Sequence, residues 1–151
     1  MSEEYRNIYR TARRGAGFTQ ESAAERLGVS VESLRAYETG QRVPSNEVVE
    51  LMVICYNAQH LAYQHLHETN ALAARIVPEL QQRSVLEAAV RIYNRMSKIS
   101  SKHGVERLMQ IAEDGAIDQD ERAEFEAILA DIRALIQSGM ELEMFCSGPQ
   151  E

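Results

Sequence analysis

The sequence predicts an all-α protein, because apolar residues recur at helical spacing along most of its 151 residues and helix breakers are few. It contains three prolines and eight glycines against a hydrophobic content of 44%. The apolar residues are spaced three and four apart, which places them on one face of a helix. We expect five helices in residues 1–68 and a further helical region in residues 69–151.

The first helix is expected over residues 5–14, with Ile8 and either Tyr5 or Ala12 facing inward. Small and flexible residues then form a turn over residues 15–18. We expect Phe18, at the end of this turn, to anchor the core of the first domain.

Residues 19–38 predict two short helices joined at a glycine. Thr19 and Ser30 are suited to cap the two helices, and Gly28 ends the first because glycine adopts a left-handed backbone without steric cost. In the second helix the spacing of three predicts an inner face of Val31, Leu34 and Tyr37. Small and polar residues are left on its outer side: Glu32, Ser33, Arg35 and Ala36.

This block resembles the helix-turn-helix of the lambda repressor/Cro-like family, also called the Xre family. The resemblance is carried by Gln20, Ala24, Gly28, Leu34 and Tyr37. It continues through residues 38–45, which are similar to the family's E-x-G-x-x-x-P-S segment, and it covers roughly residues 5–60. It implies a lambda repressor-like DNA-binding domain of five helices.

The resemblance also implies which residues contact double-stranded DNA. The second helix, about residues 30–39, would enter the major groove with Val31, Glu32, Ser33, Arg35 and Ala36 toward the bases. Gln20, Thr39 and Arg42 would contact the phosphate backbone. Arg13 and Glu38 match a pair that fixes the orientation of the helices, so their expected role is structural support.

Two more helices should complete the first domain. Ser45 is expected to cap one whose buried stripe is Val48, Val49, Leu51, Met52 and Cys55. The next is expected over residues 57–76, in part as a linker, with a domain boundary near residue 68.

After Pro78 the pattern predicts a long helix with a narrow apolar seam of Val85, Ala89, Ile92, Met96 and Ile99, widened by Leu86, Val90 and Tyr93. A short helix around residues 105–112 follows. The last helix should be capped by Asp118 with Glu121 three residues on, and its apolar stripe runs from Phe125 to Ile136. Two long helices with broad apolar stripes favour homodimerisation, and the region is also suited to an unknown effector or protein partner.

The net charge of −7 argues against strong non-specific attraction to DNA. Residues 1–60 hold seven arginines and eight acids, whereas residues 61–151 hold nine basic and fifteen acidic residues. The first domain is therefore close to neutral, and affinity would depend on the local placement of its arginines.

No catalytic residues, metal site or cofactor are predicted. The spacing of His60, His65 and His67 does not place three rings on one helical face, so these side chains are expected in solvent. Two cysteines, an acidic start at residues 1–4 and the lack of a long apolar run predict a cytoplasmic protein without membrane association.

Two other functions fit the pattern. A protein-interaction module, such as an antitoxin or adaptor, could keep the helix-turn-helix scaffold without sequence-specific DNA reading. A small-molecule sensor would instead need a cavity in the C-terminal helices, lined by Met96, Met109 or Met140.

Overall fold

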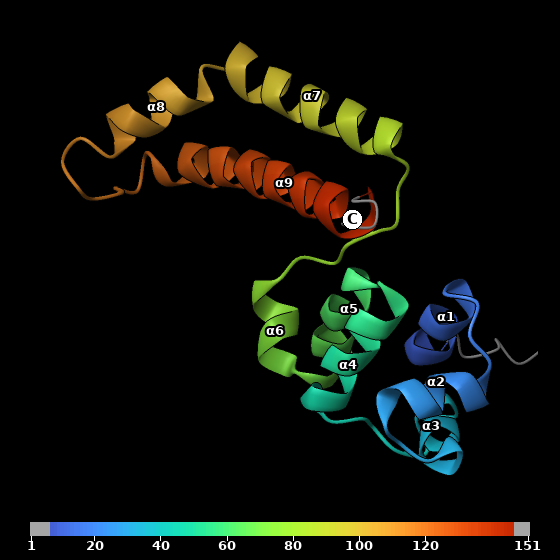
Figure 1. Ribbon diagram of the computed structural model, residues 1–151. Helices are drawn as coiled ribbons and strands as arrows, with labels where there is room; N and C mark the ends of the chain where they lie inside the picture. The colour runs from blue at the N-terminus through green and yellow to red at the C-terminus, as the bar shows by residue number, and fades with distance from the viewer. Residues whose placement is uncertain (1–6, 147–151) are drawn as a thin grey trace, which may run out of the picture. The chain divides into compact units, whose positions relative to one another are not determined.

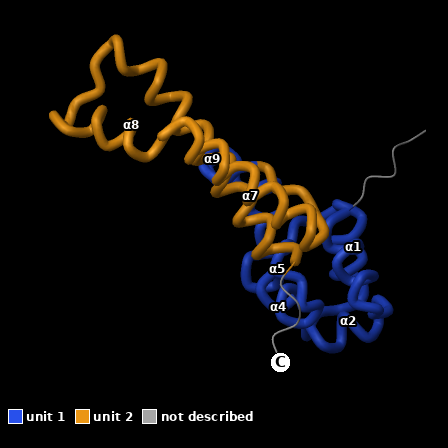
Figure 2. Tube along the Cα trace, turned by 90° about the horizontal axis from the view of Figure 1, so that it is seen from above, with its two compact units in different colours: residues 1–78 blue, residues 79–151 orange. Residues whose placement is uncertain are grey.

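The computed structural model describes residues 7–146, and this range contains nine α-helices and no strand (Figure 1). The chain divides into two compact units, unit 1 over Met1–Pro78 and unit 2 over Glu79–Glu151 (Figure 2). The predicted all-α fold, with the two-helix block near the N-terminus and a helical C-terminal region, is confirmed. Within the described range no helix is both long and apolar enough to cross a membrane.

The described residues of unit 1 form six helices: α1 (Ile8–Gly15), α2 (Gln20–Leu27), α3 (Val31–Glu38), α4 (Asn46–Tyr56), α5 (Gln59–Thr69) and α6 (Ala71–Ile76). The caps predicted for α2 and α3 are present, since the Thr19 side chain accepts from the amide of Ser22 and that of Ser30 accepts from the amide of Ser33. Gly28 ends α2 with a left-handed φ of 68°. Tyr5, one of the two alternatives for the inner face of the first helix, lies outside the described residues, whereas Ala12 is buried.

The core of unit 1 gathers around side chains with no exposed surface, Leu34 from α3, Met52 from α4 and Leu61 from α5. Phe18 packs against this core, as predicted. The stripe expected on α4 is partly wrong. Leu51 is exposed, and the buried residues are Val49, Met52, Val53 and Tyr56. The buried face of α4 is therefore rotated by about one residue from the face that was expected. Ser45 occupies the N-cap position of α4 without a side-chain capping bond.

A single helix over residues 57–76 was also a wrong prediction. The chain leaves helical geometry at Asn70, whose φ of −123° and ψ of 107° are those of an extended residue. The Asn70 side chain accepts from the amides of Leu72 and Ala73 and so caps α6. α5 and α6 are therefore separate helices, and residue 68 lies near the end of α5 rather than at the end of unit 1.

Unit 2 is built on two long antiparallel helices, α7 (Val85–Ser101) and α9 (Arg122–Cys146), joined by the short α8 (Gly104–Ile111) (Figure 1). Polar contacts cross between them in antiparallel order, Arg95 to Ser138 at 3.1 Å and Lys98 to Asp131 at 2.5 Å. The reciprocal hydrogen bonds of the predicted capping box are present, since Asp118 Oδ1 accepts from the amide of Glu121 at 2.9 Å and Glu121 Oε2 accepts from the amide of Asp118 at 3.4 Å. They close a turn that leads into α9, whose regular part begins at Arg122.

The apolar seam predicted on α7 is only partly covered, since Ile99 is buried and Ile92 half-buried while Val85, Ala89 and Met96 are exposed. Ala88 and Ile99 are the buried apolar residues of α7, whereas Val85, Leu86, Val90, Tyr93 and Met96 are exposed. The sequence pattern correctly found an apolar face, but most of its large side chains are not the ones buried in unit 2. The buried side chains of the two helices are Ala88 and Ile99 of α7 with Ile128, Ser138 and Glu141 of α9, so the contact mixes apolar and polar residues.

A buried carboxylate holds one end of unit 2 together. Glu141 has no exposed side-chain surface, and its oxygens accept from the amide of Gln81 at 3.2 Å and from Arg83 Nε at 2.7 Å. Arg91 Nε lies 3.9 Å from the same carboxylate. Since a buried charge is tolerated only when paired and hydrogen-bonded, these contacts fix the segment before α7 against α9.

We predict that Glu141→Ala lowers the free energy of unfolding of unit 2 by about 2–3 kcal/mol, because it leaves Arg83 and Arg91 without their carboxylate. Glu143→Ala, two positions along α9 and exposed, is the matched control and should change it by less than about 0.5 kcal/mol. Urea unfolding followed through amide NMR signals of α7 measures both. Equal effects of the two substitutions would contradict the role given to Glu141.

Candidate nucleic-acid interface

The segment from Thr19 to Glu38 forms two helices packed through small side chains. Ala23, Ala24 and Leu27 of α2 are buried against the core that also takes Leu34 and Tyr37 of α3. The left-handed Gly28 lets the chain reverse between the helices within three residues, before Ser30 starts α3. This geometry buries one side of α3 and leaves its other side to solvent.

A buried ion pair ties α1 to the end of α3. Arg13 Nε donates to Glu38 Oε1 at 2.5 Å and Arg13 Nη2 to Oε2 at 3.0 Å, with the two side chains only 8% and 2% exposed. Arg13 Nη1 also donates to the carbonyl of Phe18 at 2.5 Å, and Gln20 Nε2 donates to Glu38 Oε2 at 2.8 Å. The pair therefore connects α1, the turn before α2, α2 itself and α3.

The electrostatics of this pair follow from its burial. Burial raises the pKa of the Glu38 carboxyl, but the hydrogen bonds from Arg13 and Gln20 and the charge of Arg13 outweigh this and lower the pKa below its usual value of 4.5. The hydrogen bond to Glu38 raises the pKa of Arg13 in turn. Both groups are held in their charged forms at neutral pH.

A second tie to α3 was missed by sequence reasoning. The side chain of Asn7 donates to the carbonyl of Tyr37 at 2.8 Å and also accepts from the amide of Arg10, so it caps α1 and binds the end of α3. The preference of asparagine for N-cap positions was the available signal, but the expected helix start at residue 5 placed Asn7 inside the helix.

The residues expected to face the bases differ in their exposure. Glu32 and Arg35 are exposed, while Val31, Ser33 and Ala36 are half-buried. Val31 packs against the core, and the Ser33 hydroxyl accepts from Ser30 at 2.9 Å. The two long polar side chains on the outer side of α3 are therefore Glu32 and Arg35, one of each charge.

The three residues expected at phosphates make contacts within the protein. Gln20 is bonded to Glu38, and Thr39 donates to the carbonyls of Arg35 and Ala36. Arg42 donates to the Tyr37 hydroxyl at 2.8 Å with its guanidinium 4.9 Å from the centre of that ring. Arg42 is nevertheless exposed, and the N–H groups of its guanidinium that do not bond to Tyr37 are left to bond other acceptors.

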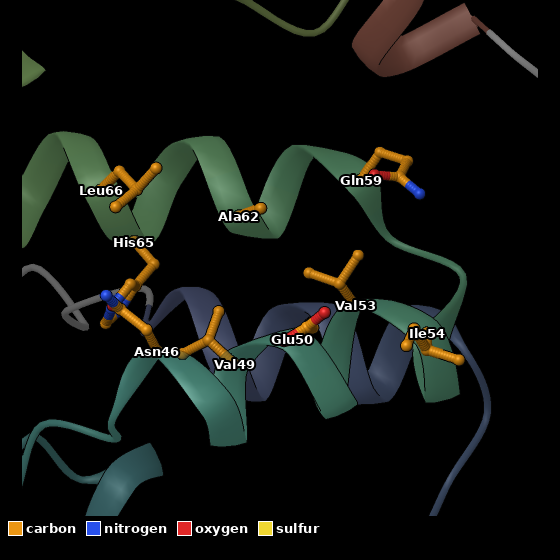
Figure 3. A pocket seen from close by; sticks show the side chains of 9 residues that line it. All are labelled: Asn46, Val49, Glu50, Val53, Ile54, Gln59, Ala62, His65 and Leu66. Atoms are coloured by element: carbon orange, nitrogen blue, oxygen red, sulfur yellow. The ribbon is translucent and has the colours of Figure 1, made fainter.

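A groove of about 460 Å³ lies between α4 and α5, away from these residues (Figure 3). His65 lies at one end with Nε2 3.0 Å from Asn46 Oδ1, and its Nδ1 meets the Tyr9 hydroxyl at 2.8 Å. The expectation of an exposed His65 was wrong, because the side chain is buried. This burial lowers the pKa of the imidazole below its usual value. Both ring nitrogens are already partnered, so His65 serves packing between α1, α4 and α5.

The methionines expected around a cavity in unit 2 include Met96 and Met109, and both are exposed.

Comparison with known families supports the helix-turn-helix assignment. Residues 10–65 match a family model described as a helix-turn-helix domain, a range that runs from α1 into α5. The match covers residues 10–65 of the 151 and supports a helix-turn-helix domain in this part of unit 1. Searches of curated proteins and of solved structures give no significant match.

We predict that Glu38→Gln destabilises unit 1 by about 2–3 kcal/mol at neutral pH, because it leaves the Arg13 charge buried without its counter-charge. The lowered pKa of Glu38 means that its stabilisation is complete above the unfolded pKa and is lost as pH falls through the folded pKa. The difference between the wild type and Glu38→Gln should therefore shrink as the pH falls below the usual carboxyl pKa of 4.5. Urea unfolding followed at amide signals of α2 and α3 measures it.

The matched control for this prediction is Glu32→Gln, which neutralises an exposed carboxylate on the same helix. It should leave the unfolding free energy within about 0.5 kcal/mol of the wild type. A pH-independent difference between the wild type and Glu38→Gln would contradict the ion-pair account.

Proposed function

We propose that this chain is a sequence-specific DNA-binding transcriptional regulator of the lambda repressor/Cro-like (Xre) type, acting in the cytoplasm as a homodimer. The helix-turn-helix family match supports the DNA-binding class. The observation that carries the proposal is the anchoring of α3. Its inner side is fixed by Leu34, Tyr37 and the Arg13–Glu38 pair, while its outer side offers Glu32 and Arg35. A rigid helix with polar ends outward is what the major groove admits.

In this proposal α3 lies in the major groove and its side chains read base edges. Arg35 donates a bidentate pair to the O6 and N7 atoms of a guanine, and Glu32 accepts from the amino group of a cytosine. Val31, Ser33 and Ala36 approach the bases closely because they are short, with Val31 or Ala36 meeting a thymine methyl.

The proposed phosphate contacts are made by the edge of the domain. Gln20 lies in the first turn of α2, whose free amides favour an anion, and Thr39 and Arg42 follow α3. The stacking of Arg42 on Tyr37 supports this role, since it holds the guanidinium in one place before binding. Arg10 and Arg14, both exposed on α1, are among the positive charges of this nearly neutral unit that could add to phosphate attraction.

We assign the two functions to different parts of the chain. Residues 1–68 are proposed to bind DNA, and residues 69–151 are proposed for dimerisation or sensing. A two-fold dimer aligns two half-sites on one face of the DNA, about one helical turn or a multiple of it apart. Repression by occluding polymerase is the simplest output of such binding. No catalytic role and no cofactor form part of the proposal.

We predict that Arg35→Ala weakens binding to a cognate duplex by about 1–3 kcal/mol and relaxes the preference at one base pair, because the bidentate contact to guanine is lost. Arg75→Ala is the matched control, since it removes the same charge from an exposed position on α6 and should leave sequence preference unchanged. Fluorescence anisotropy with cognate and scrambled duplexes measures both.

Equal losses of affinity for cognate and scrambled duplexes would assign Arg35 to phosphate rather than to a base. If the wild type itself does not distinguish the two duplexes, the protein-interaction module becomes the better account of the scaffold.

A further inference from the structure

Unit 2 presents an apolar surface that its own helices do not cover. Val85, Leu86, Val90, Tyr93 and Met96 of α7 and Ile136 of α9 are exposed, and we call these six side chains the outer flank. Leu86 and Tyr93 are 73% and 72% exposed, values that a core position does not reach. The feature is more than scattered surface hydrophobicity, because five of the six side chains lie within twelve residues of one helix.

Val85 and Met96 of α7 lie on the same side of the hairpin as Leu135 of α9. Val85 and Met96 each precede by three residues a side chain that is buried in unit 2, Ala88 and Ile99. On α9, half-buried Leu135 precedes the buried Ser138 by the same interval, and Ile136 follows it. In two antiparallel right-handed helices, an equal offset from the contact line leads to the same side of the pair.

The two helices also place these residues at the same level. Arg95 bonds to Ser138 and Lys98 to Asp131, so the part of α7 that carries Val85 to Met96 runs beside the second half of α9. The five residues of the outer flank on α7 therefore form one strip along that helix, and Ile136 lies level with its Met96 end.

The opposite side of α7 is polar. Glu87, Arg91, Asn94 and Lys98 follow one another there at intervals of three and four. Between Val85 and Met96 the exposed apolar strip of α7 is interrupted by no charged side chain, so this strip offers nothing to pair with a strongly charged partner. The exposed apolar surface of the outer flank is on the order of 600 Å², close to the ~800 Å² that each partner contributes to a stable interface.

We infer that the outer flank binds the same surface of a second copy of this chain, in a two-fold arrangement that joins two α7–α9 hairpins into a four-helix bundle. An uncharged apolar patch satisfies an isologous contact, in which each residue must tolerate its own symmetry mate. The hairpin itself buries few large apolar side chains of these two helices, Ile99 and Ile128, beside Ala88, Ser138 and Glu141, so most of the apolar core of the bundle would come from the outer flanks.

This inference deepens the proposed homodimeric regulator and rests on that proposal for its biological role, but the contact itself is tested without DNA. Sedimentation equilibrium of the full chain distinguishes the 17.1 kDa monomer from a species of twice that mass. The wild type should sediment as a dimer. Leu86→Glu combined with Tyr93→Glu should raise the dimer dissociation constant at least about 100-fold, because two carboxylates would be buried at the contact.

Asn94→Glu is the matched control, since it adds the same charge at an exposed position on the other flank of α7 and should leave the dimer intact. Circular dichroism verifies that the variants keep their helices. If the double variant loses helicity, Tyr93→Ser replaces it, because this milder change at an exposed position should still weaken the dimer measurably.

A wild type that stays monomeric at about 100 μM, well above the micromolar constants of weak complexes, would overturn the inference. A dimer that survives the flank substitutions, or one that Asn94→Glu disrupts equally, would overturn it as well. Binding of the monomeric variant to a duplex with a single half-site separates this question from the proposed function. Retained half-site binding with lost dimerisation supports both proposals. A wild type that dimerises but binds no DNA would contradict the proposed regulator function and leave the dimer contact standing.

Discussion

The placement of α3 depends on one buried ion pair. Arg13 and Glu38 are twenty-five residues apart, yet their hydrogen bonds connect α1 to the end of α3, and Gln20 and the Phe18 carbonyl join the same network. The hydrophobic core alone would allow α3 to slide or turn by small amounts, because apolar contacts are not directional. A two-point hydrogen bond between planar groups removes that freedom. Reading a base edge requires such positional precision, so the stability of the domain and its proposed recognition share one interaction.

The distribution of charge sets how such a protein would grip DNA. Unit 1 is close to neutral, and the second half of the chain is acidic. Long-range attraction to phosphate is therefore weak, which limits non-specific binding and leaves affinity to a few arginines and to the number of half-sites engaged. Two copies held together bind a second half-site at high effective concentration, so a weakly charged domain gains affinity from dimerisation that it lacks alone. The outer flank of unit 2 is the surface from which that gain would come.

Local signals in the sequence predicted local structure well. Thr19 and Ser30 cap the starts of α2 and α3, and Gly28 ends α2, as expected. These features were predictable because capping and left-handed turns depend only on neighbouring residues. Contacts between distant residues were harder to predict. The hydrogen bonds of His65 to Tyr9 and Asn46, for example, do not follow from any periodic pattern in the sequence. The Arg13–Glu38 contact was expected only through a family resemblance. On α7 the apolar residues were correctly identified, but their spacing did not show which of them α9 covers, since periodicity reveals that a face is apolar and not what covers it. The functions of Glu32 and Arg35 stay predictions.

The central claim is that unit 1 reads DNA sequence through α3. Selection of bound sites from randomised duplex DNA, carried out with the full chain at two salt concentrations, tests it most directly. We expect a two-fold symmetric motif whose half-sites lie about one helical turn or a multiple of it apart, and the same motif at both salt concentrations with weaker binding at the higher one. Bound sequences without any shared motif, or a motif that vanishes when salt is raised, would contradict the claim.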